Sequence, residues 1–178
     1  MKSRDIALGG VLAALAVVFL VLGGAIGIGT FAGPMLASLL LIPLLDRVPL
    51  SGCVGWYAVA ALLGSLLCPD RETAAIFVFL GWYPIGKRRF DRLPHLPRLL
   101  VKLAVFHAAI AAAYAVLILL FRLESLVREL RETAPAWLVG ILLLGNAAFF
   151  FYDLVLTRLS TAWHLRFGRK APPSAKGA

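Results

Sequence analysis

Long apolar runs, broken by short polar and basic stretches, dominate the pattern of this chain. The first run, from Ile6 to Ile28, contains no charged residue. A helix rises about 1.5 Å per residue, so this run is long enough to cross the hydrocarbon core of a bilayer. It therefore predicts a membrane-spanning helix.

Six apolar segments can be marked in this way. They cover residues 6–28, 31–45, 53–68, 73–86, 99–121 and 135–156. The second to fourth are shorter than the roughly 20 residues of a full crossing, and Pro34 and Pro43 interrupt the second. We expect an all-α, integral membrane bundle of six transmembrane helices, several of them short or interrupted by proline. This single domain should cover residues 1–160, followed by a basic, disordered tail over 161–178.

The composition agrees with a membrane protein. The chain is 61% hydrophobic and 15% charged, whereas soluble domains have about 45–50% apolar and about 25% charged residues. The net charge of +9 raises the possibility of nucleic-acid binding. The basic residues, however, occur in short clusters between apolar runs, without a nucleic-acid-binding motif.

These basic clusters predict the topology. With the N-terminus in the cytoplasm, 14 of the 18 Lys and Arg residues fall in inside segments. Only Arg71, Arg122, Arg128 and Arg131 fall outside. Because cytoplasmic segments carry the excess of Lys and Arg, we expect both termini on the inner side of the cytoplasmic membrane.

The stretch FLGWYPIGKRRF, residues 79–90, marks the inner end of the fourth segment. We expect Pro84 and Gly86 to end this helix, with Trp82 and Tyr83 as interfacial aromatic residues. The following basic residues would anchor the inner face. Further prolines at 94 and 97 should keep the next loop from becoming helical.

The loop at 122–133 has leucine and valine at helical spacing and charges that cancel. It predicts a short amphipathic helix on the outer surface. This helix is either a plain connector or a lid over an outward cavity.

The sequence contains no recognisable set of catalytic residues. Ser38 and Ser65 lack a GxSxG context, the three histidines are isolated from one another, and no phosphate-binding loop is present. Cys53 and Cys68 are about 22 Å apart if they lie on one helix, which excludes a disulfide between them. We therefore expect no enzyme activity, no metal site and no cofactor, and packing roles for both cysteines.

Polar side chains within the apolar segments are candidates for function, because such groups are costly in a membrane. They are His107, Asn146 and Asp153. Each also has a structural alternative: packing for His107, an interhelical hydrogen bond for Asn146, and an ion pair with Lys102 or Arg158 for Asp153. At the outer turn, Asp70 is expected to cap the helix that follows it.

Small residues predict close helix packing. Gly9, Gly10, Ala13 and Ala14 form two such pairs on the first segment. A second thin face runs along the fifth segment, through Ala104, His107, Ala108, Ala111, Ala112 and Ala115. Either face can pack within the bundle or against another membrane subunit, for which the first segment is the better candidate.

The six short helices, the inside termini and the opening RDIALGGVLAALAVVFLVLGG (4–24) resemble the S components of energy-coupling-factor transporters. S components bind vitamins or other micronutrients. The segment PDRETAAIFVFLGWYPIGK (69–87) also looks like one in unassigned bacterial membrane proteins related to them. The resemblance implies docking of a transmembrane coupling subunit at Gly9, Gly10, Ala13 and Ala14, with two cytoplasmic ATPases.

The resemblance further implies an outward pocket, formed by the outer halves of the last three segments and the glycine-rich first outer loop. The candidate ligand-binding residues are Thr30, Phe31, Tyr114, Trp137 and Asn146. Arg88 and Arg89 are candidates for a cytoplasmic contact with the coupling partner. The main alternative is a structural or assembly membrane protein without a small-molecule cargo. A channel is disfavoured, because the sequence supplies few polar residues for a path across the membrane.

Overall fold

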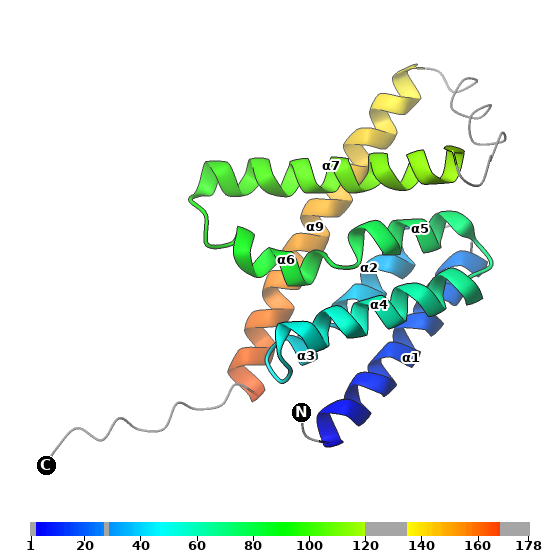
Figure 1. Cartoon of the computed structure of the whole chain (residues 1–178). Coiled ribbons are helices and arrows are strands. Elements are labelled where there is room, and N and C mark those ends of the chain that lie inside the picture. The colour runs from blue at the N-terminus through cyan, green and yellow to red at the C-terminus, as the bar shows by residue number, and fades with distance from the viewer. Residues whose placement is uncertain (1–2, 27–28, 120–134, 168–178) are drawn as a thin grey trace, which may run out of the picture.

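The computed structural model describes residues 3–26, 29–119 and 135–167. Every regular element within these ranges is a helix, which confirms the all-α prediction. The helices are α1 (Ser3–Ala25), α2 (Ala32–Leu39), α3 (Ile42–Leu45), α4 (Leu50–Leu67), α5 (Arg71–Leu80), α6 (Tyr83–Phe90), α7 (His95–Leu119) and α9 (Pro135–Phe167) (Figure 1). The amphipathic helix predicted over 122–133 lies outside the described residues.

Within the described residues, four helical stretches are long and apolar enough to cross a membrane. They are Ser3–Ala25, Leu50–Leu67, His95–Leu119 and Val139–Trp163. The chain is therefore a membrane protein with several candidate spans. The predicted count of six is not confirmed, because the second and fourth predicted segments are each divided into two short helices.

In both divided segments the break lies just before a proline. Pro43 lies in the first turn of α3 and Pro84 in the first turn of α6. Proline is tolerated there because the first-turn N–H groups have no partner within the helix. The prediction that Pro84 ends a helix is thus wrong, and the break occurs earlier, at Gly81. A side chain at Gly81 would place Cβ 2.6 Å from the Phe77 carbonyl oxygen.

The start of α7 requires a similar correction. The helix begins at His95 and includes Pro97 in its first turn, so the expected non-helical loop ends before His95. At the other end of the chain, α9 has 33 residues and continues to Phe167. Residues 161–167 of the predicted tail are therefore helical, and the rest of that tail lies outside the described residues.

The buried core has two main parts. In the first, α1 packs against α2 and α4, with α5 beside them, around Leu20, Leu41, Trp56 and Phe77. Trp56 donates a hydrogen bond through Nε1 to the Gly9 carbonyl oxygen at 3.1 Å. Both cysteines are free and buried, as predicted for packing residues.

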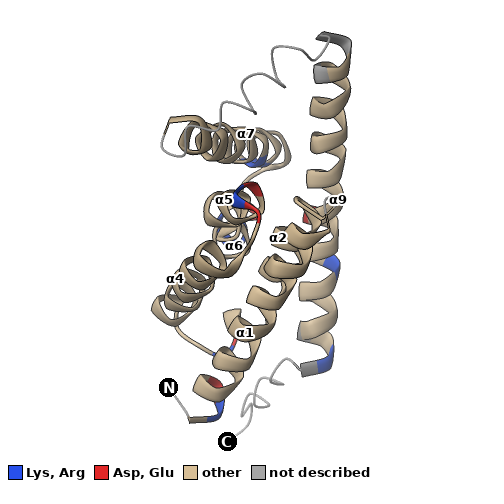
Figure 2. Cartoon of the chain, turned by 90° about the vertical axis from the view of Figure 1, so that its right-hand side faces the viewer, with Lys and Arg blue, Asp and Glu red and all other residues tan. Residues whose placement is uncertain are grey.

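The second part of the core joins α6, α7 and α9 through aromatic side chains. Phe106 of α7 stacks on Phe149 of α9 with ring centroids 4.5 Å apart, and Tyr83 of α6 meets Phe149 edge-on at 5.2 Å. The N-terminal part of α9 stands clear of the other described helices (Figures 1 and 2), where Trp137 is 72% exposed. The helix α9 therefore packs against the other described helices mainly through its middle part.

The first described residues of α1 and the last of α9 lie at the same end of the molecule in both views (Figures 1 and 2). This arrangement agrees with termini on one side of the membrane. The side that this end faces stays a prediction from the basic residues.

Candidate functional site

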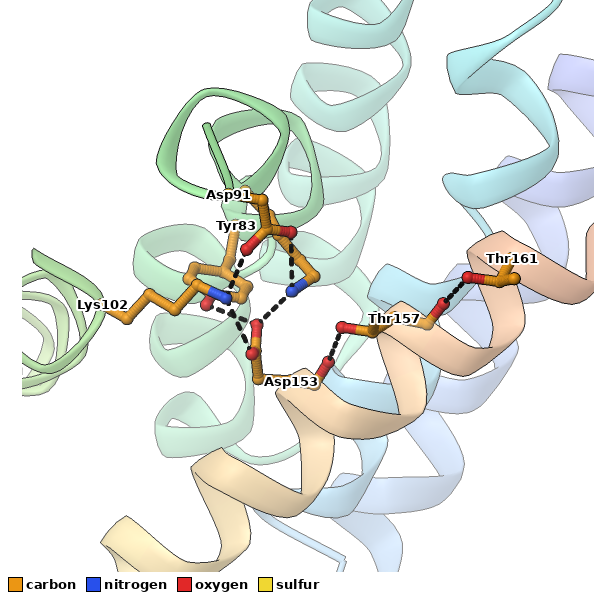
Figure 3. Close-up of polar contacts among 7 residues, drawn as sticks. Tyr83, Asp91, Lys102, Asp153, Thr157 and Thr161 are labelled. Atoms are coloured by element: carbon orange, nitrogen blue, oxygen red, sulfur yellow. Dashed lines mark hydrogen bonds and ion pairs between the residues drawn. The ribbon is translucent and has the colours of Figure 1, made fainter. Parts of the chain in front are cut away.

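A cluster of charged side chains lies where α6, α7 and α9 meet (Figure 3). At its centre, the Asp153 carboxylate accepts three hydrogen bonds. Oδ1 accepts from the Tyr83 hydroxyl at 2.8 Å and from Lys87 Nζ at 2.6 Å, and Oδ2 accepts from Lys102 Nζ at 2.8 Å. One carboxylate thus links two other helices to α9.

Asp91 completes this cluster, which we call the charged network (Tyr83, Lys87, Asp91, Lys102 and Asp153). Its carboxylate lies 3.0 Å from Lys87 Nζ and 2.6 Å from Lys102 Nζ. Each lysine therefore contacts both carboxylates, and the two positive and two negative charges cancel. Lys87 and Lys102 are only 7% and 6% exposed. Their burial is tolerable because ion pairing and hydrogen bonding offset the desolvation of each charge.

The spacing of residues along α6 explains how one short helix supplies most of the network. Tyr83, Lys87 and Asp91 are four residues apart, so they lie on one face of the helix and its C-terminal cap. Lys102 lies on the buried face of α7 with Phe106. Asp153 follows the buried Phe149 and Tyr152 on α9.

Two threonines extend the polar surface along α9 beyond Asp153. The Thr157 hydroxyl donates to the Asp153 carbonyl oxygen at 2.8 Å, and the Thr161 hydroxyl donates to the Thr157 carbonyl oxygen at 2.9 Å (Figure 3). These bonds use the hydroxyl hydrogens and leave oxygen lone pairs free to accept. The threonines therefore present acceptors to the space beside α9.

Three residues of the charged network, Asp91, Lys102 and Asp153, line a cleft between the start of α7 and the middle of α9. This α7–α9 cleft has a volume of about 630 Å³. Its lining residues are Asp91, His95, Leu96, Arg98, Leu99, Lys102, Phe150, Asp153 and Thr157. It therefore combines charged, hydroxyl and apolar groups on one surface.

A smaller cleft of about 210 Å³ is lined by Lys87 and by other residues of α3, α6 and α9. It shares Asp91 and Thr157 with the α7–α9 cleft and also includes Ser160 and Thr161. Both clefts lie near the segment that joins α6 to α7, which the basic residues assign to the cytoplasm. The outward pocket implied by the family resemblance would lie at the opposite end.

The residues predicted to bind a ligand do not line either of these clefts. The Tyr114 hydroxyl donates to Glu72 Oε1, which links α7 to the start of α5. Asn146 Nδ2 donates to the Leu142 carbonyl oxygen within α9 at 2.8 Å, whereas its structural alternative was a bond between helices. Trp137 is largely exposed, Phe31 is 40% exposed, and Thr30 is half-buried beside it.

The predicted docking residues of α1 form two pairs, one packed within the protein and one exposed. Ala13 is buried in the core and Gly9 accepts the bond from Trp56. Gly10 and Ala14 are exposed, and a Cβ at Gly10 would meet no atom within 4 Å. Only this second pair leaves a small-residue surface open to a partner.

The predicted cytoplasmic docking residues also differ in their contacts. Arg88 is held within the chain by an ion pair with Asp46 and by a hydrogen bond from Nη1 to the Leu45 carbonyl oxygen at 2.8 Å. Arg89 is exposed. Of this pair, Arg89 is the more accessible to another subunit.

The structural alternatives for the intramembrane polar residues have mixed outcomes. The ion pair between Asp153 and Lys102 is confirmed. The packing role of His107 is wrong, because this side chain is exposed and its Nδ1 lies 2.9 Å from the Leu103 carbonyl oxygen. The thin face of α7 is mostly exposed as well, and the buried face instead carries larger side chains such as Phe106 and Leu117.

Sequence reasoning missed the burial of Tyr83 and Lys87. We expected Tyr83 as an interfacial residue and Lys87 as part of the inner anchor, yet Tyr83 is fully buried and both bind Asp153. The four-residue spacing from Tyr83 to Lys87 to Asp91 was the available signal. It becomes informative only once α6 is recognised as a helix.

Comparison of the chain with models of known families, with curated proteins and with solved structures finds no match.

Proposed function

We propose that this chain is a non-enzymatic, multi-pass subunit of the cytoplasmic membrane that binds a small molecule in the α7–α9 cleft. The observation that carries the proposal is a cleft of about 630 Å³ lined by the buried Lys102 and by its two carboxylate partners, Asp91 and Asp153. Ligand sites commonly have volumes of about 300–1,000 Å³. Ionisable groups within membrane helices commonly mark ligand or ion sites.

The proposal keeps the S-component type of subunit, which binds its cargo and is energised by partners. The exposed pair Gly10 and Ala14 supports it, because a surface of small residues allows another membrane helix to approach closely. The partners would be a transmembrane coupling subunit and two cytoplasmic ATPases. The ligand site would differ from the one first expected, since the cleft lies at the predicted cytoplasmic end.

A specific observation also favours the second candidate, a structural or assembly protein without cargo. The four charges of the network neutralise one another, so the network can hold α6, α7 and α9 together without any ligand. The two candidates differ in one consequence. Only a binding subunit should retain a small molecule that depends on the cleft.

Native mass spectrometry of the protein, purified from its host in a mild detergent, tests this consequence. We expect a bound small molecule with the wild-type chain, together with co-purifying membrane and ATPase subunits. The variant Leu99→Trp places a large side chain in the cleft and should lose the small molecule. The matched control Leu100→Trp changes an exposed neighbour that does not line the cleft and should retain it. A wild-type protein without ligand and without partner subunits would contradict the proposal and favour the structural role.

A further inference from the structure

The α7–α9 cleft has a distinct apolar side. Leu96, Leu99 and Phe150 line it and are 76%, 43% and 42% exposed. Leu99 and Phe150 belong to helical stretches that are candidate membrane spans. The apolar side of the cleft is therefore suited to contact with lipid chains.

Counted with Lys87, which does not line the cleft but pairs with both of its carboxylates, the charged side of the cleft carries one positive charge in excess. Lys87, Lys102, Asp91 and Asp153 cancel within the network. Arg98 remains. In the part of the chain that the structure describes, no carboxylate lies within ion-pair distance of Arg98, and its Nη2 instead lies 2.8 Å from His95 Nδ1. The guanidinium retains further N–H donors, whose fork geometry suits a phosphate.

Apolar and cationic surfaces thus meet within one cleft at the end of a candidate span. A ligand that satisfies both has an anionic head group and an apolar chain. Basic pockets between transmembrane helices on the cytoplasmic side bind the head groups of anionic lipids. A water-soluble anion would leave the exposed leucine and phenylalanine side chains without a partner.

We infer that the ligand of the α7–α9 cleft is an anionic membrane phospholipid, with its phosphate at Arg98 and its chain along Leu99 and Phe150. The inference rests on the proposed function of the cleft and names the chemical class of its ligand. Thr157 lies on the same wall and offers an acceptor to hydroxyl groups of the head group.

The experiment measures binding of three probes to the purified full chain, by native mass spectrometry in detergent. The probes are phosphatidylglycerol, phosphatidylcholine with the same acyl chains, and glycerol phosphate without a chain. We expect wild-type protein to prefer phosphatidylglycerol over phosphatidylcholine by about tenfold. Both lipids carry the phosphate, but the choline group adds a positive charge beside Arg98 and lacks the hydroxyl groups that Thr157 could accept from. Glycerol phosphate should bind far more weakly than phosphatidylglycerol.

Three variants test whether the lipid preference depends on Arg98. Arg98→Gln should abolish the preference for phosphatidylglycerol. Arg98→Lys should retain part of this preference, because lysine keeps the positive charge but lacks the paired N–H donors of the guanidinium group. The control Arg92→Gln removes an exposed arginine that lines neither cleft and should change nothing.

The possible failures are distinguishable. Equal binding of the two lipids, or a preference that survives in Arg98→Gln, would overturn the anionic class but leave the cleft as a binding site. Binding of glycerol phosphate as tight as that of phosphatidylglycerol would overturn the membrane lipid as the source. If none of the three probes binds, while another small molecule is retained by the wild-type chain and lost in Leu99→Trp, the lipid inference alone fails. If the wild-type chain binds nothing at all, the proposed function fails with it.

Discussion

Asp153 is a single carboxylate that accepts hydrogen bonds from two lysines and one tyrosine. Its side chain is 17% exposed, so water reaches it only partly. An isolated carboxylate at such a place would be unfavourable. The three donors stabilise the carboxylate at this position, and the same bonds hold Lys102 at the wall of the α7–α9 cleft and Lys87 at the wall of the smaller cleft.

Asp70 has a simpler role, which leads to a prediction. Its carboxylate accepts from the backbone N–H groups of Glu72 at 3.1 Å and Thr73 at 3.0 Å, which confirms the expected helix cap. Asp70→Ala should lower the free energy of unfolding by about 0.5–2 kcal/mol. Asp70→Asn should lose less, because its amide oxygen can still cap α5. Thermal unfolding in detergent checks both variants, and equal losses for Ala and Asn would contradict the capping role.

The role of Asp70 was predicted correctly and the burial of Lys87 was not, and the difference has a physical reason. A cap is a local arrangement, because Asp70 bonds to residues two and three positions later. Lys87 instead binds Asp153, 66 positions away. Lys87 stands in a run of basic residues typical of a membrane anchor, and only the packing of α6 against α9 separates it from its exposed neighbours Arg88 and Arg89.

At the scale of the helices, α1 and α2 approach closely at glycine. A Cβ at Gly23 would lie 2.8 Å from Gly33 Cα, which is a backbone atom that cannot move aside independently. Gly23→Ala should therefore lower the free energy of unfolding by about 1–3 kcal/mol. The control Gly10→Ala lies on the same helix in open space and should be neutral or stabilising by up to about 1 kcal/mol. Similar unfolding temperatures for both variants would contradict the close approach.

The apolar runs predicted the helices well, because backbone groups in lipid must be bonded within the protein and a helix satisfies them locally. The breaks within these helices could not be predicted in the same way. The break at Gly81 lies where the Phe77 ring and carbonyl leave no room for a side chain. The extension of α9 to Phe167 passes through polar residues that hydropathy alone assigns to a tail.

The candidate site was predictable only in part. Asp153 and Lys102 were visible as a charged pair in apolar segments, and their contact is confirmed. Asp91, Arg98 and His95 were not, because the cleft forms only when the start of α7 lies beside α9. The outer candidates depended on the family resemblance, and neither cleft includes them.

At the scale of the whole molecule, the topology can be tested by labelling. Arg71 and Arg92 are exposed and lie at opposite ends of the α5–α6 pair. In a background with Cys53 and Cys68 replaced by alanine, a membrane-impermeant maleimide added to intact cells should label Arg71→Cys. It should label Arg92→Cys only after permeabilisation. Labelling of both from the same side would show that α5 and α6 do not cross the membrane, and would contradict the six-span prediction.

The charged network joins α6, α7 and α9 into one unit, and its balance of charge gives the most direct test. Asp153→Asn leaves two lysines with one carboxylate, and Lys87→Gln leaves two carboxylates with one lysine. Breaking a buried pair in this way typically costs about 3–5 kcal/mol. The double variant retains the neutral pair of Lys102 and Asp91.

The measurement is the free energy of unfolding of these three variants in detergent, beside the control Asp46→Asn. The control breaks the more exposed pair with Arg88 and should cost less than about 1 kcal/mol. We expect each single variant of the network to lose about 3–5 kcal/mol, and the double variant to lose less than the sum of the two. Single variants that behave like Asp46→Asn, or losses that simply add in the double variant, would contradict a charged network that holds α6, α7 and α9 together.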